Sequence, residues 1–276
     1  MMIQEIAPHK LDNTYAPYTA QDEDIVLAFS QSDLLVSKES GQPYTYREVK
    51  DQAFTKEESF VYLFSVDETR FFLAPRVPQE FVDQSEVRGV RSYGKEAPEL
   101  QLAAATALHL RSWYNTHRFC GVCGHPMHPD SKERAMKCES CGHMAFPVIC
   151  PAIIVAITDG ERILLTRSAL RKNAIFSLVA GYNEIGETLE QTVALEAMEE
   201  VGVKVKNIRA YGDQPWGFSS SLMIGFFADL DGDDTISIQE EELKEAKWFT
   251  RDTMPVNESP IDLTHHMMEM FRLGKV

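Results

Sequence analysis

A run of glutamates is the feature of this sequence that most directly suggests chemistry. The stretch EIGETLEQTVALEAMEE (184–200) holds six glutamates, whereas no lysine or arginine occurs between Lys172 and Lys204. On an α-helix, Glu196, Glu199 and Glu200 are spaced i, i+3 and i+4, so they project within an arc of about 100°. Carboxylates this close repel one another unless a cation lies among them, and Mg²⁺ or Mn²⁺ prefers such oxygen ligands. The spacing therefore predicts a divalent-metal site, with a purely solvated acidic face as the alternative.

The residues around this acidic run predict how it is held. Val193, Ala197 and Val201 supply an adjoining apolar face that can pack on a sheet. Gly181 and Gly186 precede the helix and allow the backbone to approach bound ions closely. A solvated acidic helix would need neither the glycines nor the clustered carboxylates.

Four of the five cysteines form a second chemical motif. Cys120 and Cys123, then Cys138 and Cys141, make two C-x-x-C pairs that are separated by 14 residues. This is the spacing of a zinc ribbon, in which four thiolates close a tetrahedral site, so the zinc should be structural. Two disulfides are the alternative, which a cytosolic chain seldom keeps. Cys150, beside Pro151, is expected to be a small buried hydrophobic residue.

The composition narrows the class of protein. The chain has 276 residues and a net charge of −15, which argues against general nucleic-acid binding. A protein this acidic can act on an anionic substrate only through a local basic patch, helix N-termini or metal ions. No apolar run approaches the ~20 residues of a membrane span, and the first residues do not resemble a signal peptide. We expect a cytoplasmic protein.

The order of apolar and polar segments predicts an α+β protein. We expect a β-rich N-terminal domain (1–95), a connecting helix (96–117), the zinc ribbon (118–146) and a larger C-terminal domain (147–276). In the first domain the strand-like runs are 24–30, 33–37, 59–66 and 70–75. In the last domain they are 152–158 and 162–168, joined by a turn at Asp159–Gly160, followed by 176–180, 203–211, 221–230 and 246–250. A closing helix is expected over 260–273.

The glutamate segment resembles the Nudix box. Gly181 is followed after five residues by Glu187 and after seven more by LEAMEEVGV (195–203). The family motif is a Gly, a Glu and then Arg-Glu-hydrophobic-any-Glu-Glu-any-Gly-hydrophobic, so the one departure is Leu195 in place of the arginine. In the family that arginine is thought to orient a box glutamate, here Glu187. Because leucine donates no hydrogen bond, the sequence predicts slower turnover or weaker metal binding.

Two further motifs make the resemblance more specific. A zinc ribbon directly ahead of a Nudix domain is similar to the NADH pyrophosphatase branch, also known as NAD-capped RNA hydrolases. The stretch DQPWGFSSS (213–221) is similar to the Ser-Gln-Pro-Trp-Pro-Phe-Pro-any-Ser signature of that branch, from which Asp213, Gly217 and Ser219 depart. The resemblance implies a C-terminal α/β/α sandwich built on a mixed sheet.

The resemblance also implies roles for individual residues. The ligands of Mg²⁺ or Mn²⁺ would be four carboxylates and one backbone carbonyl: Glu196, Glu199, Glu200, Glu242 and Ala180. Glu199 and Glu200 would be catalytic, with Glu200 orienting or deprotonating the attacking water. The substrate would meet Glu133, Phe146, Tyr182 and the dinucleotide pocket formed by Gln214, Pro215, Trp216, Gly217, Phe218, Ser219, Ser220 and Ser221.

Three functions are compatible with this resemblance. The first is metal-dependent hydrolysis of NAD(H) to nicotinamide mononucleotide and AMP, with action on NAD-capped RNA 5′ ends as an extension. The second is a related diphosphatase for ADP-ribose or another nucleoside diphosphate. The third is a nucleotide sensor that has lost turnover, which Leu195 favours and the intact glutamate triad does not. Family members are often homodimers, so a homodimer is expected here by analogy.

Overall fold

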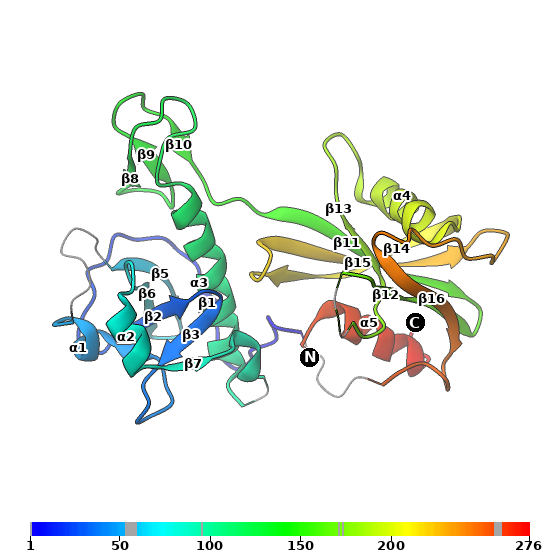
Figure 1. Ribbon diagram of the computed structural model, residues 1–276, viewed down its shortest axis with the longest axis horizontal. Coiled ribbons are helices and arrows are strands. Elements are labelled where there is room, and N and C mark those ends of the chain that lie inside the picture. Colours follow the sequence, from blue (N-terminus) through cyan, green and yellow to red (C-terminus); the bar gives the residue numbers. More distant parts are fainter. Residues whose placement is uncertain (1, 53–59, 95, 171, 173, 257–260) are drawn as a thin grey trace. The chain divides into compact units, whose positions relative to one another are not determined.

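The computed structural model describes residues 2–52, 60–94, 96–170, 172, 174–256 and 261–276, which divide into two compact units (Figure 1). The N-terminal unit comprises Glu5–Val148 and Gly217–Ser220. The C-terminal unit comprises Met1–Gln4, Ile149–Trp216 and Ser221–Val276. Among the described residues, no helix combines the length and the apolarity that crossing a membrane requires.

A seven-stranded sheet forms the body of the N-terminal unit. Its strands are β1 (Leu11–Asp12), β2 (Ile25–Ser30), β3 (Asp33–Val36), β4 (Tyr44–Thr45), β5 (Val61–Val66), β6 (Thr69–Leu73) and β7 (Glu86–Arg88). The order is β1-β5-β6-β2-β3-β7, with β4 paired to β2, and β2–β6 is parallel. All four strand-like runs of the sequence lie in these strands, although residue 59 of one run falls outside the described residues.

Short helices and one long helix complete this part of the unit. The short ones are α1 (Tyr46–Val49), α2 (Gln79–Gln84) and the 3₁₀ helix η1 (Val90–Ser92), and the long one is α3 (Pro98–Thr116). α3 begins with Pro98, whose fixed backbone angle suits a first helical position. Its buried face contains Ala104, Ala107 and Leu108, together with the buried polar residue Gln101.

A separate three-stranded sheet carries the cysteine motif. Its strands are β8 (Met127–Pro129), β9 (Met136–Cys138) and β10 (Met144–Ala145), in the order β10-β9-β8. Met127 and Met136 pack with Trp113 of α3 and with Cys120 and Cys138 in a small apolar cluster. So small a sheet buries little apolar surface, and it therefore needs the cysteine site to hold it together.

The C-terminal unit contains a six-stranded mixed sheet. Its strands are β11 (Cys150–Asp159), β12 (Arg162–Ser168), β13 (Val179–Tyr182), β14 (Val205–Trp216), β15 (Ser221–Leu230) and β16 (Leu243–Thr250). The order is β14-β15-β11-β12-β16, with β13 paired to β11. β11 and β15 are parallel and the other pairs are antiparallel. The predicted hairpin at Asp159–Gly160 is present, with Asp159 paired to Arg162.

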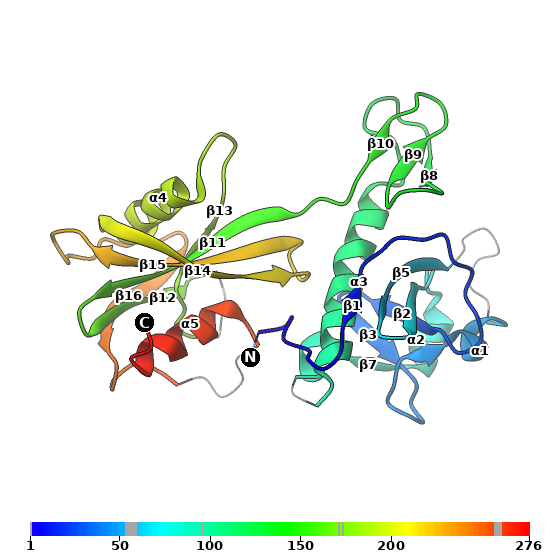
Figure 2. The same ribbon diagram turned by 180° about the vertical axis from the view of Figure 1, so that it is seen from behind.

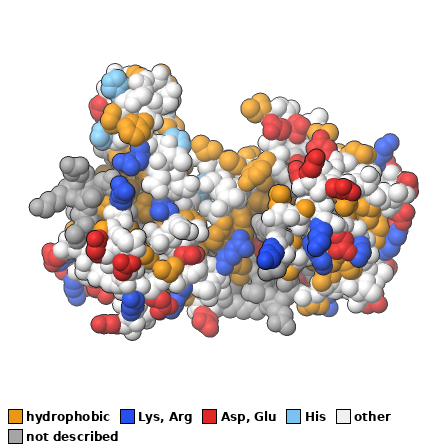
Figure 3. Space-filling view, in the orientation of Figure 1, with side chains coloured by type: hydrophobic (Ala, Val, Ile, Leu, Met, Phe, Trp, Pro, Cys, Tyr) orange, Lys and Arg blue, Asp and Glu red, His pale blue; other side chains and the backbone are white. Residues whose placement is uncertain are grey.

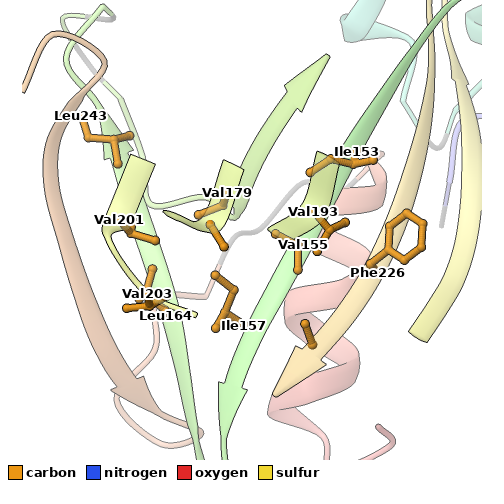
Figure 4. Packing of buried hydrophobic residues seen from close by; sticks show 12 residues of the cluster. Ile153, Val155, Ile157, Leu164, Val179, Val193, Val201, Val203, Phe226 and Leu243 are labelled. Carbon is orange, nitrogen blue, oxygen red and sulfur yellow. The ribbon is translucent and has the colours of Figure 1, made fainter. Parts of the chain in front are cut away.

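Two helices, α4 (Leu189–Val201) and α5 (Leu263–Arg272), cover opposite faces of this sheet (Figures 1 and 2). Alternate residues of β11 explain the layering, because successive side chains of a strand point to opposite faces. Ile153 and Val155 pack with the apolar residues of α4, whereas Ile154 packs with those of α5. Figure 4 shows the α4 side of this core. The unit is therefore an α/β/α sandwich on a mixed sheet, and the chain as a whole is an α+β protein.

Several strands differ in extent from the sequence prediction. β11 and β16 begin earlier than expected, at Cys150 and Leu243. The run 176–180 was expected as one strand, but Ser177 bridges Thr166 of β12, and β13 starts only at Val179, where the pairing changes to β11. β14 continues beyond the predicted end at residue 211 through Pro215 to Trp216. Proline is tolerated there because β14 is an edge strand of the sheet.

Candidate functional site

Helix α4 carries the clustered glutamates and has well-defined ends. Thr188 caps its start, because the hydroxyl accepts from the Gln191 N–H at 3.3 Å while the Gln191 side chain accepts from the Thr188 N–H at 2.8 Å. Gly202 ends the helix with φ = 73°, a left-handed conformation that suits glycine. The predicted apolar face, Val193, Ala197 and Val201, is fully buried. Burial of that face fixes which glutamates turn toward the sheet.

Glu200 is the most buried carboxylate of the cluster, with 6% of the residue exposed. Burial, which is the main cause, and the charges of Glu196 and Glu242 together raise its pKa to about 8. A hydrogen bond from the Ala180 backbone acts in the opposite direction and lowers this pKa, as expected for an N–H that donates to a carboxylate. The structure thus brings Ala180 to Glu200 through its N–H, and the predicted metal contact of its carbonyl stays a prediction.

Glu196 lies directly against the strand that precedes the helix. A Cβ atom added to Gly181 would lie 1.8 Å from Oε1 of Glu196, so only glycine fits at that position of β13. Burial is the main cause that raises the pKa of Glu196, followed by the charges of Glu199, Glu242 and Glu187. Glu199 itself is exposed on the same helix. The carboxylates therefore lie close enough for the charge of each neighbour to raise the pKa of Glu196.

Glu242 reaches the cluster from a different part of the chain. The loop before β16 is held to the end of α4, since Ser237 N–H donates to the Val201 carbonyl and Gln239 N–H to the Glu200 carbonyl, each at 3.0 Å. These bonds satisfy carbonyls that a helix C-terminus leaves without partners. Glu242 then follows three residues after Gln239 and is anchored through its own carbonyl, which accepts from the Ala169 N–H at 2.7 Å.

The donor set of this cluster fits a hard divalent cation. Among the described residues, no Lys, Arg or His lies within 4.0 Å of the carboxylate oxygens of Glu196, Glu199, Glu200 or Glu242. In the described part of the chain, the four cysteine sulfurs are the only group of three or more candidate ligand atoms within 4.8 Å of one another, so the carboxylate oxygens of the cluster are more widely spaced. Carboxylates without a cationic partner are the ligand type that Mg²⁺ and Mn²⁺ prefer, and these side chains must move closer together to share one ion. Figure 3 shows acidic side chains gathered over α4 and the loop before it.

The side chain of Gln214, a predicted pocket residue, is hydrogen-bonded to the protein's own backbone. It is 1% exposed, its Nε2 donates to the Ile261 carbonyl at 2.9 Å and its Oε1 accepts from the Leu263 N–H at 2.7 Å. These two bonds fix the start of α5 against β14. Contact between the Gln214 amide and a substrate would require one of these bonds to break.

The neighbouring pocket residues are distributed over both units. In the C-terminal unit, Pro215 is exposed, Trp216 is half-buried, and Ser221 lies with its hydroxyl 3.4 Å from that of Tyr182. Tyr182 is 55% exposed, which leaves its ring free to stack on a planar ligand.

The turn between β14 and β15 belongs to the N-terminal unit. A Cβ on Gly217 would lie 2.0 Å from the Ala105 carbonyl oxygen of α3, which explains glycine where the signature has proline. The guanidinium of Arg91 lies 4.7 Å above the ring of Phe218. Ser219 is exposed and Ser220 has a positive φ of 57°. Contacts with α3 and η1 thus account for Gly217 and Phe218 without a ligand.

Glu133 and Phe146 are both exposed in the N-terminal unit. Glu133 lies in a turn that Asp130 organises, whose Oδ2 accepts from the backbone N–H of Lys132 and of Glu133. Phe146 directly follows β10 and has half of its surface in contact with solvent. Both side chains are available to a ligand, and their predicted substrate contacts stay predictions.

The four cysteines form a closed metal centre. Sulfur–sulfur distances are 3.6 Å for Cys120–Cys141, 3.5 Å for Cys123–Cys138 and 3.4 Å for Cys123–Cys141. Four sulfurs at 2.3 Å from a tetrahedral zinc lie about 3.8 Å apart, whereas a disulfide needs about 2.05 Å. The cysteines are free, and the set therefore fits one structural zinc ion.

The two halves of this centre repeat the same backbone turn. Gly124 N–H donates to the Cys120 carbonyl and Gly142 N–H to the Cys138 carbonyl, with φ values of 75° and 76° at the glycines. Each turn bends the chain back over its own cysteines. Glycine suits both positions because their φ values are positive.

Comparison with known proteins agrees with this architecture. The model of the NUDIX domain matches residues 149–270, and that of the NADH pyrophosphatase zinc ribbon domain matches residues 115–146. A solved Nudix hydrolase from Nitrosomonas europaea is 22% identical, covering 56% of this chain and 90% of its own with a TM-score of 0.49, too low a likeness to bear on function.

Curated relatives are considerably closer in sequence. The NAD-capped RNA hydrolase NudC of Salmonella heidelberg (strain SL476) is 43% identical over 187 residues, which are 68% of this chain and 71% of the relative. NudC of Enterobacter sp. (strain 638) is 45% identical over 166 residues, which are 60% of this chain and 64% of that relative. The chain belongs to the Nudix hydrolase family, in the zinc-ribbon branch that contains the NudC proteins.

Proposed function

We propose that this protein is an NAD⁺ diphosphatase that hydrolyses the diphosphate bond of NAD(H), giving nicotinamide mononucleotide and AMP, and that it also removes NAD caps from RNA. The observation that carries the proposal is the carboxylate cluster of Glu196, Glu199, Glu200 and Glu242 beside Gly181. The identity of 43% to NAD-capped RNA hydrolases of the same domain pair supports the substrate class.

Mg²⁺ or Mn²⁺ fits the carboxylate cluster, where it would neutralise the diphosphate and make bound water more acidic. Glu196, Glu199, Glu200 and Glu242 would hold the ions, with the Ala180 carbonyl as a further oxygen. Glu200, the most buried carboxylate of the cluster, is the residue proposed to take a proton from water. Water adds across the P–O–P bridge, so that each product carries one phosphate.

Substrate recognition is assigned to exposed aromatic rings. Tyr182 and Phe146, each about half exposed within its own unit, are the rings proposed to stack on a nucleobase. Trp216 lies at the end of β14 and is only half-buried, which leaves part of its indole available. As family members are often homodimers, we also propose a homodimer, which sedimentation at enzyme concentration tests.

The experiment is a product analysis with matched variants. The zinc-loaded protein is incubated with NADH, NAD⁺, ADP-ribose and NAD-capped RNA in Mg²⁺ or Mn²⁺, and the products are separated by chromatography. AMP and nicotinamide mononucleotide from NAD(H) are expected, together with 5′-monophosphate RNA from the capped substrate. Glu200→Gln should remove at least 99% of this activity, as general-base catalysis contributes about 10²–10⁴-fold.

Glu190→Gln is the matched control, because Glu190 lies on the same helix but is exposed and outside the cluster. Its activity should equal that of the unaltered protein. If only ADP-ribose gives products, ADP-ribose takes the place of NAD(H) as the substrate. If NADH binds but gives no product, the protein is a nucleotide sensor.

A further inference from the structure

Glu187 of the Nudix box is held by a residue that the sequence motifs do not mark. Oγ1 of Thr192 lies 2.9 Å from Oε2 of Glu187. We propose that Thr192 is a positioning residue that orients the Glu187 carboxylate in the metal site, in place of the arginine for which this chain has Leu195. The inference rests on the proposed function and deepens it, since it concerns the same site.

The hydrogen-bond pattern fixes the direction of the contact. Asn183 Nδ2 lies 2.7 Å from the Thr192 hydroxyl oxygen and donates to it, so the hydroxyl proton is left for an acceptor. Two acceptors are within reach, the Glu187 carboxylate at 2.9 Å and the Thr188 carbonyl at 3.3 Å. The shorter, charge-assisted bond is the stronger one. The hydroxyl therefore donates to Glu187.

The surroundings make this contact rigid. Thr192 is 2% exposed, so its hydroxyl does not exchange its partners for bulk water. Asn183 is fixed in turn, because its backbone N–H donates to the Pro151 carbonyl of β11 at 3.1 Å. A continuous chain of bonds thus runs from the central sheet through Asn183 and Thr192 to the carboxylate.

The orientation of Glu187 bears on the metal ligands themselves. The charge of Glu187 acts on the carboxyl of Glu196, which touches Gly181. Among the ion pairs of the described residues, none involves Glu187. Thr192 is consequently the hydrogen-bond donor that holds the Glu187 carboxylate in place. Held there, Glu187 would be a neighbour of the bound ions or an additional ligand.

Thr192 and Leu195 are three residues apart on α4 and hence share one face of the helix. Leu195 is 45% exposed, so an arginine at this position has room to approach Glu187. A hydroxyl and a guanidinium both donate hydrogen bonds to a carboxylate, but only the guanidinium adds a positive charge. Thr192 therefore orients the Glu187 carboxylate without reducing the negative charge of the cluster.

The test measures metal binding without substrate. Mn²⁺ is titrated into the zinc-loaded full chain, and its dissociation constant and the spin-resonance spectrum of bound Mn²⁺ are recorded. Thr192→Val, which keeps the shape but not the hydroxyl, should weaken binding about tenfold, the effect of one hydrogen bond to a charged group. Thr192→Ser keeps the hydroxyl and should stay within about twofold of the unaltered protein.

A double-mutant cycle shows whether Thr192 acts through Glu187. If it does, Thr192→Val should add almost nothing in a Glu187→Gln background, and Leu195→Arg should restore Mn²⁺ binding to the Thr192→Val protein. Circular dichroism and zinc content confirm that each variant is folded. Unchanged binding in Thr192→Val, or a loss that persists in full in the Glu187→Gln background, would overturn the proposal.

The result is independent of the substrate assignment. Should NADH prove not to be a substrate while Thr192→Val still weakens Mn²⁺ binding through Glu187, the proposed function fails and the role of Thr192 stands. Should NADH be hydrolysed equally by the Thr192→Val protein with unchanged Mn²⁺ binding, the proposed function stands and the role of Thr192 fails.

Discussion

Glu200→Gln should stabilise the folded protein at alkaline pH when no Mg²⁺ or Mn²⁺ is bound. The folded-state pKa of Glu200 is raised to about 8 from 4.5, so the buried carboxylate opposes folding once it is ionised. Glutamine has the same shape and can still accept the Ala180 N–H, but it carries no charge. The variant thus removes the unfavourable interaction without opening a cavity.

The magnitude follows from the pKa difference. Between pH 4.5 and 8 the folded state holds a proton that the unfolded state has released, so raising the pH destabilises the unaltered protein by about 1.4 kcal/mol per unit. Above pH 8 both states are ionised and the effect levels off. The advantage of Glu200→Gln should therefore be small below pH 5 and reach at most roughly 5 kcal/mol above pH 8.

Denaturant unfolding from pH 6 to 9, with zinc retained and no other divalent ion added, measures this advantage through the fluorescence of the tryptophans. Added Mg²⁺ should stabilise the unaltered protein at pH 8.5 and have little effect on Glu200→Gln, because the ion offsets the carboxylate charge. Glu190→Gln, in an exposed position, should follow the unaltered protein throughout. A difference between Glu200→Gln and the unaltered protein that is constant with pH would refute the reasoning.

Three further changes test other parts of the structure. Gly181→Ala places a Cβ 1.8 Å from Glu196 Oε1 and should lower metal affinity and activity at least tenfold, whereas Gly212→Ala, with nothing within 4 Å, should leave both unchanged. Gln214→Leu removes both bonds to the start of α5 and should cost about 2–4 kcal/mol in denaturant unfolding; an unchanged midpoint would contradict its structural role. Cys138→Ser should abolish stoichiometric zinc binding, as measured by metal analysis, and unfold β8–β10; full zinc content in the variant would disprove the closed four-cysteine site.

Much of the site could be predicted because its parts are local in sequence. The existence of α4, its apolar face and the spacing that places Glu196, Glu199 and Glu200 within one arc follow from helical periodicity. The cysteine pairs likewise specify their metal through spacing, since each C-x-x-C turn forms on its own. The closing helix and the long strands β11, β12 and β15 were also predicted, as apolar runs of this length identify buried strands.

The missed features depend on partners far apart in the chain. Gln214 is a polar residue in an apparent ligand motif, yet its partners, at 261 and 263, are known only once α5 has packed on the sheet. Residues 217–220 continue the same motif but belong to the N-terminal unit, where Gly217 lies against Ala105 of α3. The hydrogen bond from Asn183 to Thr192 was not predicted either. A threonine on the buried face of α4, beside apolar residues, could have indicated that its hydroxyl has a partner.

The sequence by itself determined the kinds of chemistry this protein can support. Residue type and short-range spacing specified a four-thiolate zinc site and a helix with three glutamates on one side, since both patterns are set within one element or turn. Only the tertiary structure decided which of those glutamates is buried, that Glu242 joins them and that Thr192 holds Glu187. Burial and contact between distant segments depend on how the sheet and helices pack, and that packing is a property of the whole chain.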